Sequence, residues 1–357
     1  PSLLGSVNKT VTKGGSRLIY SYLSSPLINL DSINARLAIT EFFLDNIYLT
    51  EDIRGLLKHV CDLERIITKL SMDRAKAQEL LKIKETIKIS NNLGIQINKL
   101  EKNKIPETIR KQVSKLTGYK DIYTLIDEAI REDNNSSRSS SYIKASYSKD
   151  INQLENIIIN CENEIEVLKE KYKNICKIDN LKISYNNFIG FFIEVSQKNT
   201  HKISNPIFIK KQSISNSVRY KTDELQVIEE KIFSAKQSLS DLEQHVLSNI
   251  IKTILESKTQ LITLAKSLNK IDVHCAFAYL AELNAYCKPK LSNDNIFSII
   301  SGRHPVIEQN MNANKQYINN SCYLNNDHRI LLITGPNMSG KSTFLRQNAL
   351  ITILAQI

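Results

Sequence analysis

The residues with the most definite chemistry lie near the end of the 357-residue sequence, at positions 335–342. Their pattern, G-x-x-x-x-G-K-S, is that of a loop that surrounds nucleotide phosphates with main-chain N–H groups. The apolar run 329–334 before the loop predicts a buried strand, and the apolar spacing over 344–354 predicts a helix after it. Since the positive end of that helix would face the phosphates, strand, loop and helix occur in the order that this kind of site requires.

The residues of this loop have distinct expected roles. Lys341 should reach the β- and γ-phosphates, and the Ser342 hydroxyl should bind Mg²⁺, so the expected cofactor is ATP or ADP with Mg²⁺. Hydrolysis also needs the acidic Walker B residues of a later strand, and the chain ends soon after Ser342. We therefore expect no catalytic residue in this chain and no ATP hydrolysis by it alone. The expected nucleotide contacts within the loop are Gly335, Pro336, Asn337, Met338, Ser339, Gly340, Lys341, Ser342 and Thr343.

Two stretches of regularly spaced apolar residues, which we call the apolar seams, predict the long helices that position the other parts of the molecule. Apolar residues recur at alternating intervals of three and four over 151–175 and again over 225–246, which predicts two long helices packed as a coiled coil. No Pro or Gly interrupts residues 223–285, so the second helix is expected to run for about 60 residues. The first seam comprises Ile151, Leu154, Ile158, Cys161, Ile165, Leu168, Tyr172 and Ile175, and the second comprises Leu225, Ile228, Ile232, Ala235, Leu239, Leu242 and Val246.

The segment between the two seams has β character and an excess of positive charge. Residues 181–195 alternate and are rich in β-branched and aromatic side chains, Asn186-Asn187 suits a tight turn, and residues 207–214 predict another strand. Glu194 is the only acidic residue in 181–221, against six lysines and one arginine. We expect a small β module that binds nucleic-acid phosphates at the tip of two antiparallel helices, with a solvated basic face as the alternative. The expected DNA contacts are Lys198, Lys202, Lys210, Lys211, Arg219 and Lys221.

The overall composition favours the same kind of partner. Lys and Arg together number 48 against 37 acidic residues, which favours a polyanion, and nucleic acid before an anionic membrane. No apolar run is long enough for a membrane span, and we expect no signal peptide. The six cysteines include no C-x-x-C pair, as is typical of reduced thiols in the cytosol. Residues 131–141 are polar and serine-rich and predict a surface loop.

Several of these motifs together resemble the MutS family of DNA mismatch-repair ATPases. The loop 334–343, with Pro-Asn-Met after its first glycine, resembles that family's own phosphate loop, and residues 301–308 resemble its Gly-Arg-His-Pro segment. Residues 190–195, with Lys211-Gln212-Ser213 and Arg219-Tyr220, resemble its clamp domain. Short motifs within residues 2–27 resemble the start of its core domain. The residue types give His304 no chemical role, and we expect it to be a structural turn residue.

The resemblance implies a mainly α fold with long antiparallel lever helices, a small β clamp module at their tip, and the beginning of a P-loop α/β ATPase domain. In the family, an aromatic residue shortly before the P-loop strand stacks on adenine beside an aliphatic neighbour. Tyr317 and Ile318 match that pair, although the family usually has Phe at the first position. The implied divisions are a helical core domain at 1–150, lever helices at 151–180 and 222–288, the DNA clamp at 181–221, and the truncated N-terminal part of the ATPase domain at 289–357.

The implied function is DNA mismatch repair, with ATP binding at the loop coupled to closure of the clamp on the DNA backbone. The whole protein would bind mismatched double-stranded DNA, form a homodimer and act with a MutL-type repair protein in the cytoplasm, at the nucleoid and not at a membrane. Because the family has further domains before its core and this chain begins with Pro, we expect part of a longer protein.

Other classes of protein share some of these features. A nucleic-acid-binding structural module with no nucleotide role is the main alternative. Met338 and the positively charged β segment 181–221 argue against the related MutS-like lineage that acts on branched DNA, which typically has Thr at that loop position and lacks the clamp. In coiled-coil ATPases of the SMC class the phosphate loop precedes the coiled coil, whereas here both seams come first.

Overall fold

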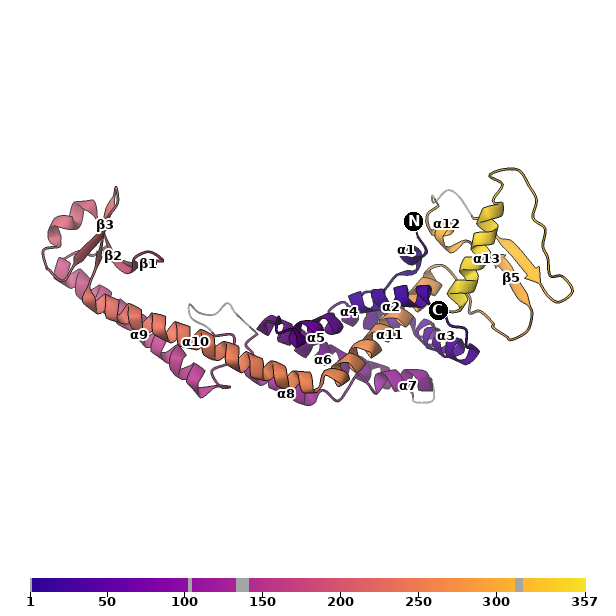
Figure 1. Ribbon diagram of the computed structural model, residues 1–357, viewed down its shortest axis with the longest axis horizontal. Coiled ribbons are helices and arrows are strands. Elements are labelled where there is room, and N and C mark those ends of the chain that lie inside the picture. The colour runs from indigo at the N-terminus through magenta and orange to yellow at the C-terminus, as the bar shows by residue number, and fades with distance from the viewer. Residues whose placement is uncertain (1, 102–104, 133–140, 312–316) are drawn as a thin grey trace. The chain divides into compact units, whose positions relative to one another are not determined.

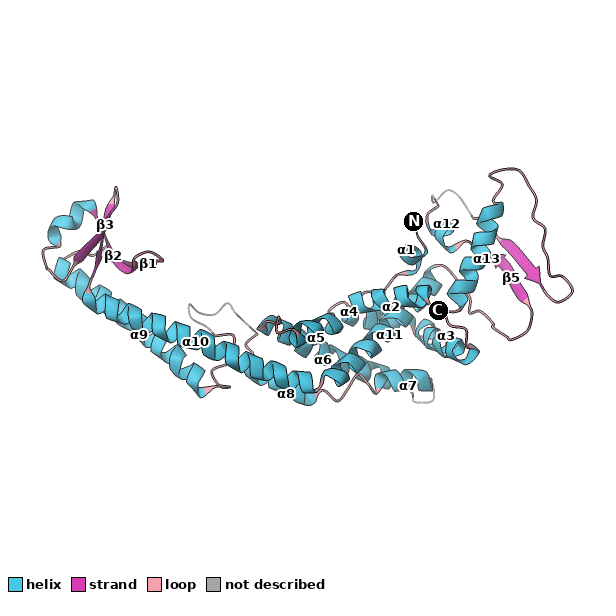
Figure 2. Ribbon diagram, viewed as in Figure 1, coloured by secondary structure: helices cyan, strands magenta, loops and turns pink. Residues whose placement is uncertain are grey.

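The chain is mainly helical, carries a small β module and forms two compact units (Figures 1 and 2). The computed structural model describes residues 2–101, 105–132, 141–311 and 317–357. The first unit contains residues 1–123 and 255–357, and the second contains residues 124–254. Residues 133–140, within the expected serine-rich loop, lie outside the described residues. The prediction of a mainly α fold with a small β module is confirmed.

Helix α11 (Lys258–Leu283) is the central element of the first unit. It contacts α2, α3, α4, α5 and α7, and it buries side chains on most of its sides between Leu261 and Leu280. A helix that is apolar on most sides must be surrounded by other elements. The helices that precede it in this unit are α1 (Leu3–Val7), α2 (Lys13–Ser24), α3 (Leu30–Asp45), α4 (Ile47–Leu57), α5 (Leu63–Ser71), α6 (Ala77–Asn98) and α7 (Glu107–Val113).

A buried carboxylate on α11 fixes the start of α2. Asp272 is fully buried and accepts hydrogen bonds from the main-chain N–H groups of Val11 and Thr12, at 3.0 and 2.8 Å, and from the Thr12 hydroxyl at 2.6 Å. Thr12 in turn caps α2 by accepting from the Gly15 N–H. Because a buried carboxylate without such donors would be costly, these bonds define where the chain enters α2.

The C-terminal part of the first unit combines a hairpin with two helices. Strands β5 (Phe297–Gly302) and β6 (Asn320–Leu324) pair antiparallel. The region also contains α12 (Pro305–Gln309) and α13 (Lys341–Ala355). The end of α13 packs on the helical core, where Ile357 is buried with residues such as Val7 and Tyr22. The strand expected at 295–300 is therefore present two residues later, whereas β6 is too polar to be recognised by periodicity.

The second unit is a pair of long helices with a four-stranded antiparallel sheet between them in sequence. Helix α9 leads into the sheet, and α10 leaves it, and Lys171 near the C-terminal end of α9 lies 2.6 Å from Glu224 in the first turn of α10. The sheet has the order β1-β2-β4-β3. The elements are α8 (Lys120–Ala129), which crosses the boundary between the units, α9 (Lys149–Cys176), β1 (Lys182–Asn186), β2 (Gly190–Ser196), the 3₁₀ helix η2 (Gln197–Lys202), β3 (Ile209–Ser213), β4 (Ser217–Lys221) and α10 (Asp223–Glu256).

The predicted apolar seams form much of the core of this unit. Most seam positions of α9 and α10 are buried or half-buried, and several of them share one cluster with inward-facing residues of the sheet. Tyr172 is fully buried and its hydroxyl shares a 2.8 Å hydrogen bond with Thr222. The seam departs from the heptad at the end of α9, where Ile175 is 41% exposed and Cys176 is buried instead. This shift follows from the end of the helix at Lys177, which adopts a left-handed conformation with φ 54°.

The expected helix of about 60 residues is interrupted. Helix α10 ends at Glu256 and α11 begins at Lys258, with Ser257 between them at φ −93° and ψ 16°. The interruption falls next to the boundary between the two compact units. Neither Pro nor Gly is involved. The two helices bury different surfaces, one stripe in α10 and most sides in α11, so tertiary packing accounts for the separation.

The strand expected at 329–334 is absent from the structure. Residues 329–336 have no regular secondary structure, and Ile330 and Leu332 are 89% and 84% exposed. A parallel strand is stable only when neighbouring strands pair with it and helices cover its faces. No strand in the described part of the chain pairs with this segment, and this explains why an apolar run of suitable composition does not form one.

All six cysteines are free, and burial raises the pKa of thiols such as those of Cys161 and Cys275. These thiols are therefore protonated and unreactive near neutral pH. Within the described ranges, no group of three or more His, Cys, Asp or Glu side chains is arranged to hold a metal ion. Over the same ranges, no helix is both long enough and apolar enough to cross a membrane.

Candidate functional site

The phosphate-loop sequence forms a tight turn that leads directly into α13. Gly335, Met338 and Gly340 have positive φ angles of 152°, 65° and 90°. Gly340 is the N-cap of α13, and its missing side chain leaves the first main-chain N–H groups of the helix without a side-chain cap. Uncapped N–H groups at the positive end of a 15-residue helix are a ready site for an anion. The helix predicted after the loop is therefore present, whereas the strand predicted before it is not.

The ammonium group of Lys341 lies over this turn. It donates to the main-chain carbonyls of Gly335 and Pro336, with Nζ–O distances of 2.5 and 2.6 Å. The adjacent Ser342 hydroxyl is exposed, and Met338 is fully exposed at the crest of the loop. The loop thus presents one cation, one hydroxyl and several main-chain N–H groups. This donor set fits the phosphates of a nucleotide, and the hydroxyl fits a single Mg²⁺ ligand.

The expected adenine-stacking residues lie in the same unit as the loop. The hydroxyl of Tyr317 donates to Gln347 Oε1 on α13 at 2.9 Å, so the structure joins this residue to the helix that begins at the phosphate loop. Ile318, its expected aliphatic neighbour, is 81% exposed. Burial raises the pKa of Tyr317, which keeps its hydroxyl protonated as a donor.

Arg303 and His304, just before α12, have a structural role. His304 caps α12, and its Nδ1 accepts from the main-chain N–H groups of Val306 and Ile307 at 3.3 and 3.2 Å. Burial lowers the pKa of His304, which favours the neutral ring that this acceptor role needs. Arg303 donates to Glu308 at 2.9 Å and to the Asn284 carbonyl at 2.7 Å. The expectation of a turn role for His304 is confirmed.

The lysines expected to contact DNA are divided by the structure into two groups. Lys198 and Lys202 lie on η2, and Lys210 and Lys211 lie on the edge strand β3; all four side chains are exposed. Lys202 also reaches the Lys177 carbonyl, with an Nζ–O distance of 3.4 Å. These four lysines, which we call the basic tip, are available to a polyanion.

Arg219 and Lys221 on β4 form the second group and are engaged within the protein. The Arg219 guanidinium lies 4.5 Å from the ring centre of Phe192, donates to Gln212 at 2.9 Å and faces Glu194 at 3.6 Å. Lys221 pairs with Glu229 of α10 at 2.7 Å and donates to the Ile189 carbonyl at 3.1 Å. These contacts position the sheet, so a role in DNA binding would require both residues to give up partners.

A β-bulge separates the two lysines of β3. Lys210 pairs with Tyr220 and Gln212 pairs with Arg219, which leaves Lys211 as the extra residue. A bulge changes the direction of the side chain at the extra residue, so the two successive lysines are not held on strictly opposite faces. Lysines and bulges also protect edge strands from pairing with other chains. The lysines and the bulge of β3 therefore also protect the exposed edge of the sheet from pairing with another chain.

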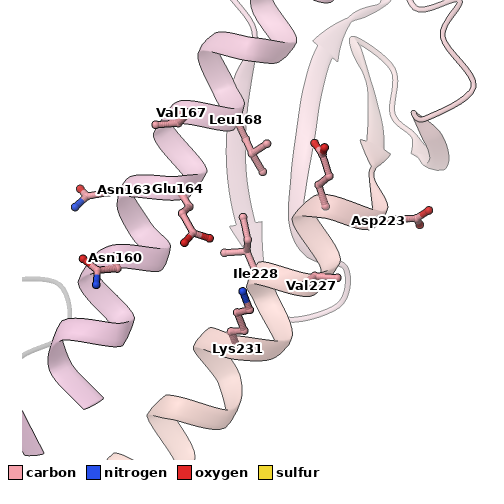
Figure 3. Close-up of a pocket in the computed structure, with 10 residues that line it drawn as sticks. Asn160, Asn163, Glu164, Val167, Leu168, Asp223, Val227, Ile228 and Lys231 are labelled. Atoms are coloured by element: carbon pink, nitrogen blue, oxygen red, sulfur yellow. The ribbon is translucent and has the colours of Figure 1, made fainter. Parts of the chain in front are cut away.

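Two grooves in the second unit differ in their relation to these residues. The first, of about 870 Å³, lies between α9 and α10, where Leu168 and Ile228 point toward each other (Figure 3). It contains none of the residues expected to bind nucleotide or DNA. The second, of about 610 Å³, is lined by the exposed rings of Phe188 and Phe233 and by charged residues of both signs, namely Lys211, Lys221, Glu229 and Glu230. Of these two grooves, the second is therefore the one that includes a residue of the basic tip, Lys211.

Sequence patterns did not single out several residues that organise these sites. Glu229 and Gln347 lie on long helices, where periodicity alone marks them only as polar positions. Their partners lie on other elements: Lys221 is on β4, and Tyr317 is 30 residues before Gln347. For Phe188 the sequence contains a weak indication of exposure. It follows Asn186-Asn187 in the expected turn, where an aromatic side chain is not expected to be buried in the core.

Comparison with known proteins adds a family relationship to this geometry. The family model described as MutS domain III matches residues 1–278, and the one described as MutS domain V matches residues 331–357. The first match includes the helical core, the paired helices and the sheet. The second includes the phosphate loop and α13. Both matches agree with the motifs from which the resemblance was inferred.

Individual relatives match the whole chain. It is 45% identical over 359 residues to a protein of Rickettsia felis and 45% identical over 358 residues to one of Rickettsia bellii. It is 44% identical over 361 residues to one of Rickettsia typhi. Each of the three is named DNA mismatch repair protein MutS. The matches cover 100% of this chain and 40% of each relative, so the chain spans about 40% of the length of these curated relatives.

Proposed function

The chain belongs to the MutS family, and from that premise we propose that it is the DNA-gripping and phosphate-binding part of an ATP-dependent DNA mismatch-repair protein. One observation carries the proposal: the chain aligns along its whole length with proteins that bear the name DNA mismatch repair protein. The whole protein would bind mismatched double-stranded DNA as a homodimer and act with a MutL-type partner. A repair role of this kind places it at the nucleoid in the cytoplasm.

The basic tip supports the DNA-binding part of this proposal. Lys198, Lys202, Lys210 and Lys211 are exposed around one small sheet. Lysine side chains contact phosphates as point charges and release condensed counterions, so they supply affinity without reading the sequence. We assign residues 181–221 to the clamp that closes on the DNA backbone. Arg219 and Lys221 contribute by positioning the sheet, and they contact DNA only if their internal partners are released.

The uncapped start of α13 supports the nucleotide-binding part. Lys341 and the main-chain N–H groups of the loop would hold the phosphates of ATP or ADP, and the Ser342 hydroxyl would be one ligand of Mg²⁺. The bound metal ion would neutralise phosphate charge. The chain's own residues position the nucleotide: the loop holds its phosphates, and Tyr317 with Ile318 would hold its adenine.

The division of labour along the chain follows from these two sites. We assign residues 1–150 to a helical core domain, 151–180 and 222–288 to lever helices whose seam forms a short coiled coil, and 289–357 to the first part of an ATPase domain. Nucleotide binding at the loop would change the position of the clamp through these helices. A coupling of this kind is a free energy shared by two sites and is measured as a change in affinity at one site when the other is filled.

The proposal is tested by measuring both ligands on the same protein. Binding to a fluorescent duplex is followed by anisotropy with and without ATP and Mg²⁺, and nucleotide binding is followed with a fluorescent ATP analogue. We expect both ligands to bind, and ATP with Mg²⁺ to change the duplex affinity. Lys341→Ala should weaken nucleotide binding and abolish the effect of ATP on the duplex while leaving nucleotide-free duplex binding unchanged.

The outcome also decides between the two classes of function. Duplex binding without nucleotide binding would favour a nucleic-acid-binding structural module with no nucleotide role, and nucleotide binding that is insensitive to Lys341→Ala would contradict the assignment of the nucleotide site to this loop. The exposed, unpaired segment 329–334 is the observation that keeps this second function in view. Absence of duplex binding at low salt would exclude both functions for the basic tip.

A further inference from the structure

A single buried amide on α13 connects three segments of the first unit. Gln347 is fully buried, and its Oε1 accepts the hydroxyl of Tyr317 at 2.9 Å. Its Nε2 donates to the main-chain carbonyl of Asn320, the first residue of β6, at 3.3 Å. Lys341 of the phosphate loop begins the same helix six residues earlier. The amide therefore links the phosphate-loop helix both to the hairpin and to the aromatic residue that precedes it.

The hairpin is shaped to admit this amide. Gly302 of β5 lies opposite Asn320 in the pairing register. A Cβ atom at Gly302 would lie 2.6 Å from Gln347 Nε2, closer than real Cβ contacts allow, and 3.0 Å from the Asn320 carbonyl oxygen, which is a tight contact. The register also shifts between Ile299 and Gly302, which opens the strand pair at this point. A glycine and a local irregularity thus create the space that Gln347 occupies.

The hydroxyl of Tyr317 is held by Gln347, to whose Oε1 it donates at 2.9 Å. Burial raises the pKa of Tyr317, so the hydroxyl stays protonated and keeps its role as donor. Phenylalanine at this position would leave Gln347 Oε1 buried without a partner, and a buried unpaired acceptor is unfavourable.

From these contacts we infer that Tyr317 and Gln347 form a positioning pair that fixes the aromatic ring relative to the phosphate-loop helix. This inference rests on the proposed function, because the ring matters only if it stacks on the adenine of a nucleotide held by the loop. A ring fixed before the nucleotide arrives loses less freedom on binding, so the pair increases affinity for the adenine part of the ligand. The phosphates, by contrast, meet only the loop and Lys341.

The test compares a ligand that uses the ring with one that does not. Binding of a fluorescent ADP analogue is measured directly, and binding of inorganic tripolyphosphate is measured by calorimetry, both with Mg²⁺. We expect Tyr317→Phe to weaken the ADP analogue about tenfold, as for the loss of one hydrogen bond to a buried group, and to change tripolyphosphate affinity less than about twofold. Tyr323→Phe is the matched control, because Tyr323 lies on β6, is 55% exposed and has no bond to α13.

A double-mutant cycle shows whether the two side chains act together. In a Gln347→Leu background the hydroxyl of Tyr317 has lost its acceptor, so adding Tyr317→Phe should change ADP affinity less than about twofold. An equal loss in both backgrounds would overturn the inference, as would an equal loss for ADP and tripolyphosphate. If Gln347→Leu does not fold, the split between the two ligands in Tyr317→Phe decides the matter alone.

Failure of the inference can be distinguished from failure of the proposed function by Lys341→Ala. If that change weakens both ligands but Tyr317→Phe weakens neither, the loop binds phosphates and the positioning pair is wrong. If Lys341→Ala affects neither ligand, or if neither binds the parent chain, the proposed nucleotide role and the positioning pair are both wrong.

Discussion

The carboxylate of Glu229 on α10 lies 2.7 Å from the ammonium group of Lys221 on β4 and occupies the space beside the Cα of Gly190. Lys221 also donates to the Ile189 carbonyl at 3.1 Å. Gly190, which follows the tight turn between β1 and β2, thus lies against α10, the helix that follows the sheet. Because both charged side chains are largely buried, the pair holds the sheet against α10 more effectively than an exposed ion pair would.

Gly190→Ala should destabilise the second unit by roughly 1–3 kcal/mol. Gly190 has φ +79°, which is unfavourable for alanine, and a Cβ there would collide with the Glu229 carboxylate. The free energy of unfolding is measured by urea denaturation with circular dichroism. Gly55→Ala is the control: Gly55 lies inside α4 with no atom near its Cβ position, so alanine should stabilise by about 0.5–1 kcal/mol. A Gly190→Ala variant as stable as the parent would contradict both the backbone strain and the collision with Glu229.

Lys210→Ala combined with Lys211→Ala should make duplex binding less dependent on salt. If both lysines neutralise phosphates, the slope of log K against log salt becomes shallower by about 1.8, or about 0.9 for each lost contact. The loss should be equal for matched and mismatched duplexes, since phosphate contacts carry no direct base information. Anisotropy titrations at several salt concentrations provide the slope.

The control for this change removes the same charge elsewhere. Lys236 and Lys252 are exposed on α10, outside the β module, so replacing both by Ala should leave the slope close to that of the parent. An unchanged slope after loss of Lys210 and Lys211 would remove them from the interface. A slope that falls equally in both double variants would indicate a general effect of net charge.

Leu168→Pro should disrupt α9 and release the sheet from its fixed position. The proline ring removes one helical hydrogen bond and clashes with the preceding turn, at a cost of about 3 kcal/mol or more. Leu168 packs against the cluster that joins α9, the sheet and α10, so this damage should spread within the second unit. Limited proteolysis should then cut between residues of about 160 and 225 while the helices of the first unit stay protected. Val167→Ala, at a 69% exposed neighbour, should leave the parental pattern.

His274 should make the protein less stable as the pH falls below neutral. Its ring is buried on α11, shares a 2.9 Å hydrogen bond with Thr40, and has a pKa lowered to about 3 by burial and by the nearby charges of Arg36 and Lys270. In the unfolded chain the ring takes up a proton near its ordinary pKa of about 6.5, so the unfolded state binds more protons between that pH and about 3. Stability is therefore lost as the pH falls through this window.

The expected size of this effect is about 1.4 kcal/mol for each pH unit below the ordinary pKa, or about 2 kcal/mol at pH 5. Urea denaturation at pH 7 and pH 5 measures it. His274→Gln keeps a polar partner for Thr40 but cannot titrate, so the difference in stability between the two pH values should shrink by about that amount. Asp272, whose pKa is raised by burial, titrates in the opposite sense and is common to both proteins. An identical pH dependence in parent and variant would contradict the assignment.

Local patterns determined the parts of this protein that depend on neighbouring residues in sequence. The phosphate loop is one of them, because glycine spacing and a following helix define its turn and leave the start of α13 uncapped. The turn at Asn186 is another: its side chain accepts from the N–H groups of Phe188 and Ile189, as short-range turn chemistry predicts. The two apolar seams belong to the same group, since a period of three and four residues lies within one helix.

Tertiary structure decided the features that depend on partners in other elements. Charge alone cannot separate the exposed Lys211 from Lys221, because only the folded chain brings Glu229 to the second of them. The same holds for Tyr317, whose partner Gln347 is 30 residues away on another element. The break at Ser257 and the unpaired segment 329–334 have the same origin: whether an apolar stretch continues as a helix or forms a strand depends on the surfaces that cover it, and composition does not specify those surfaces.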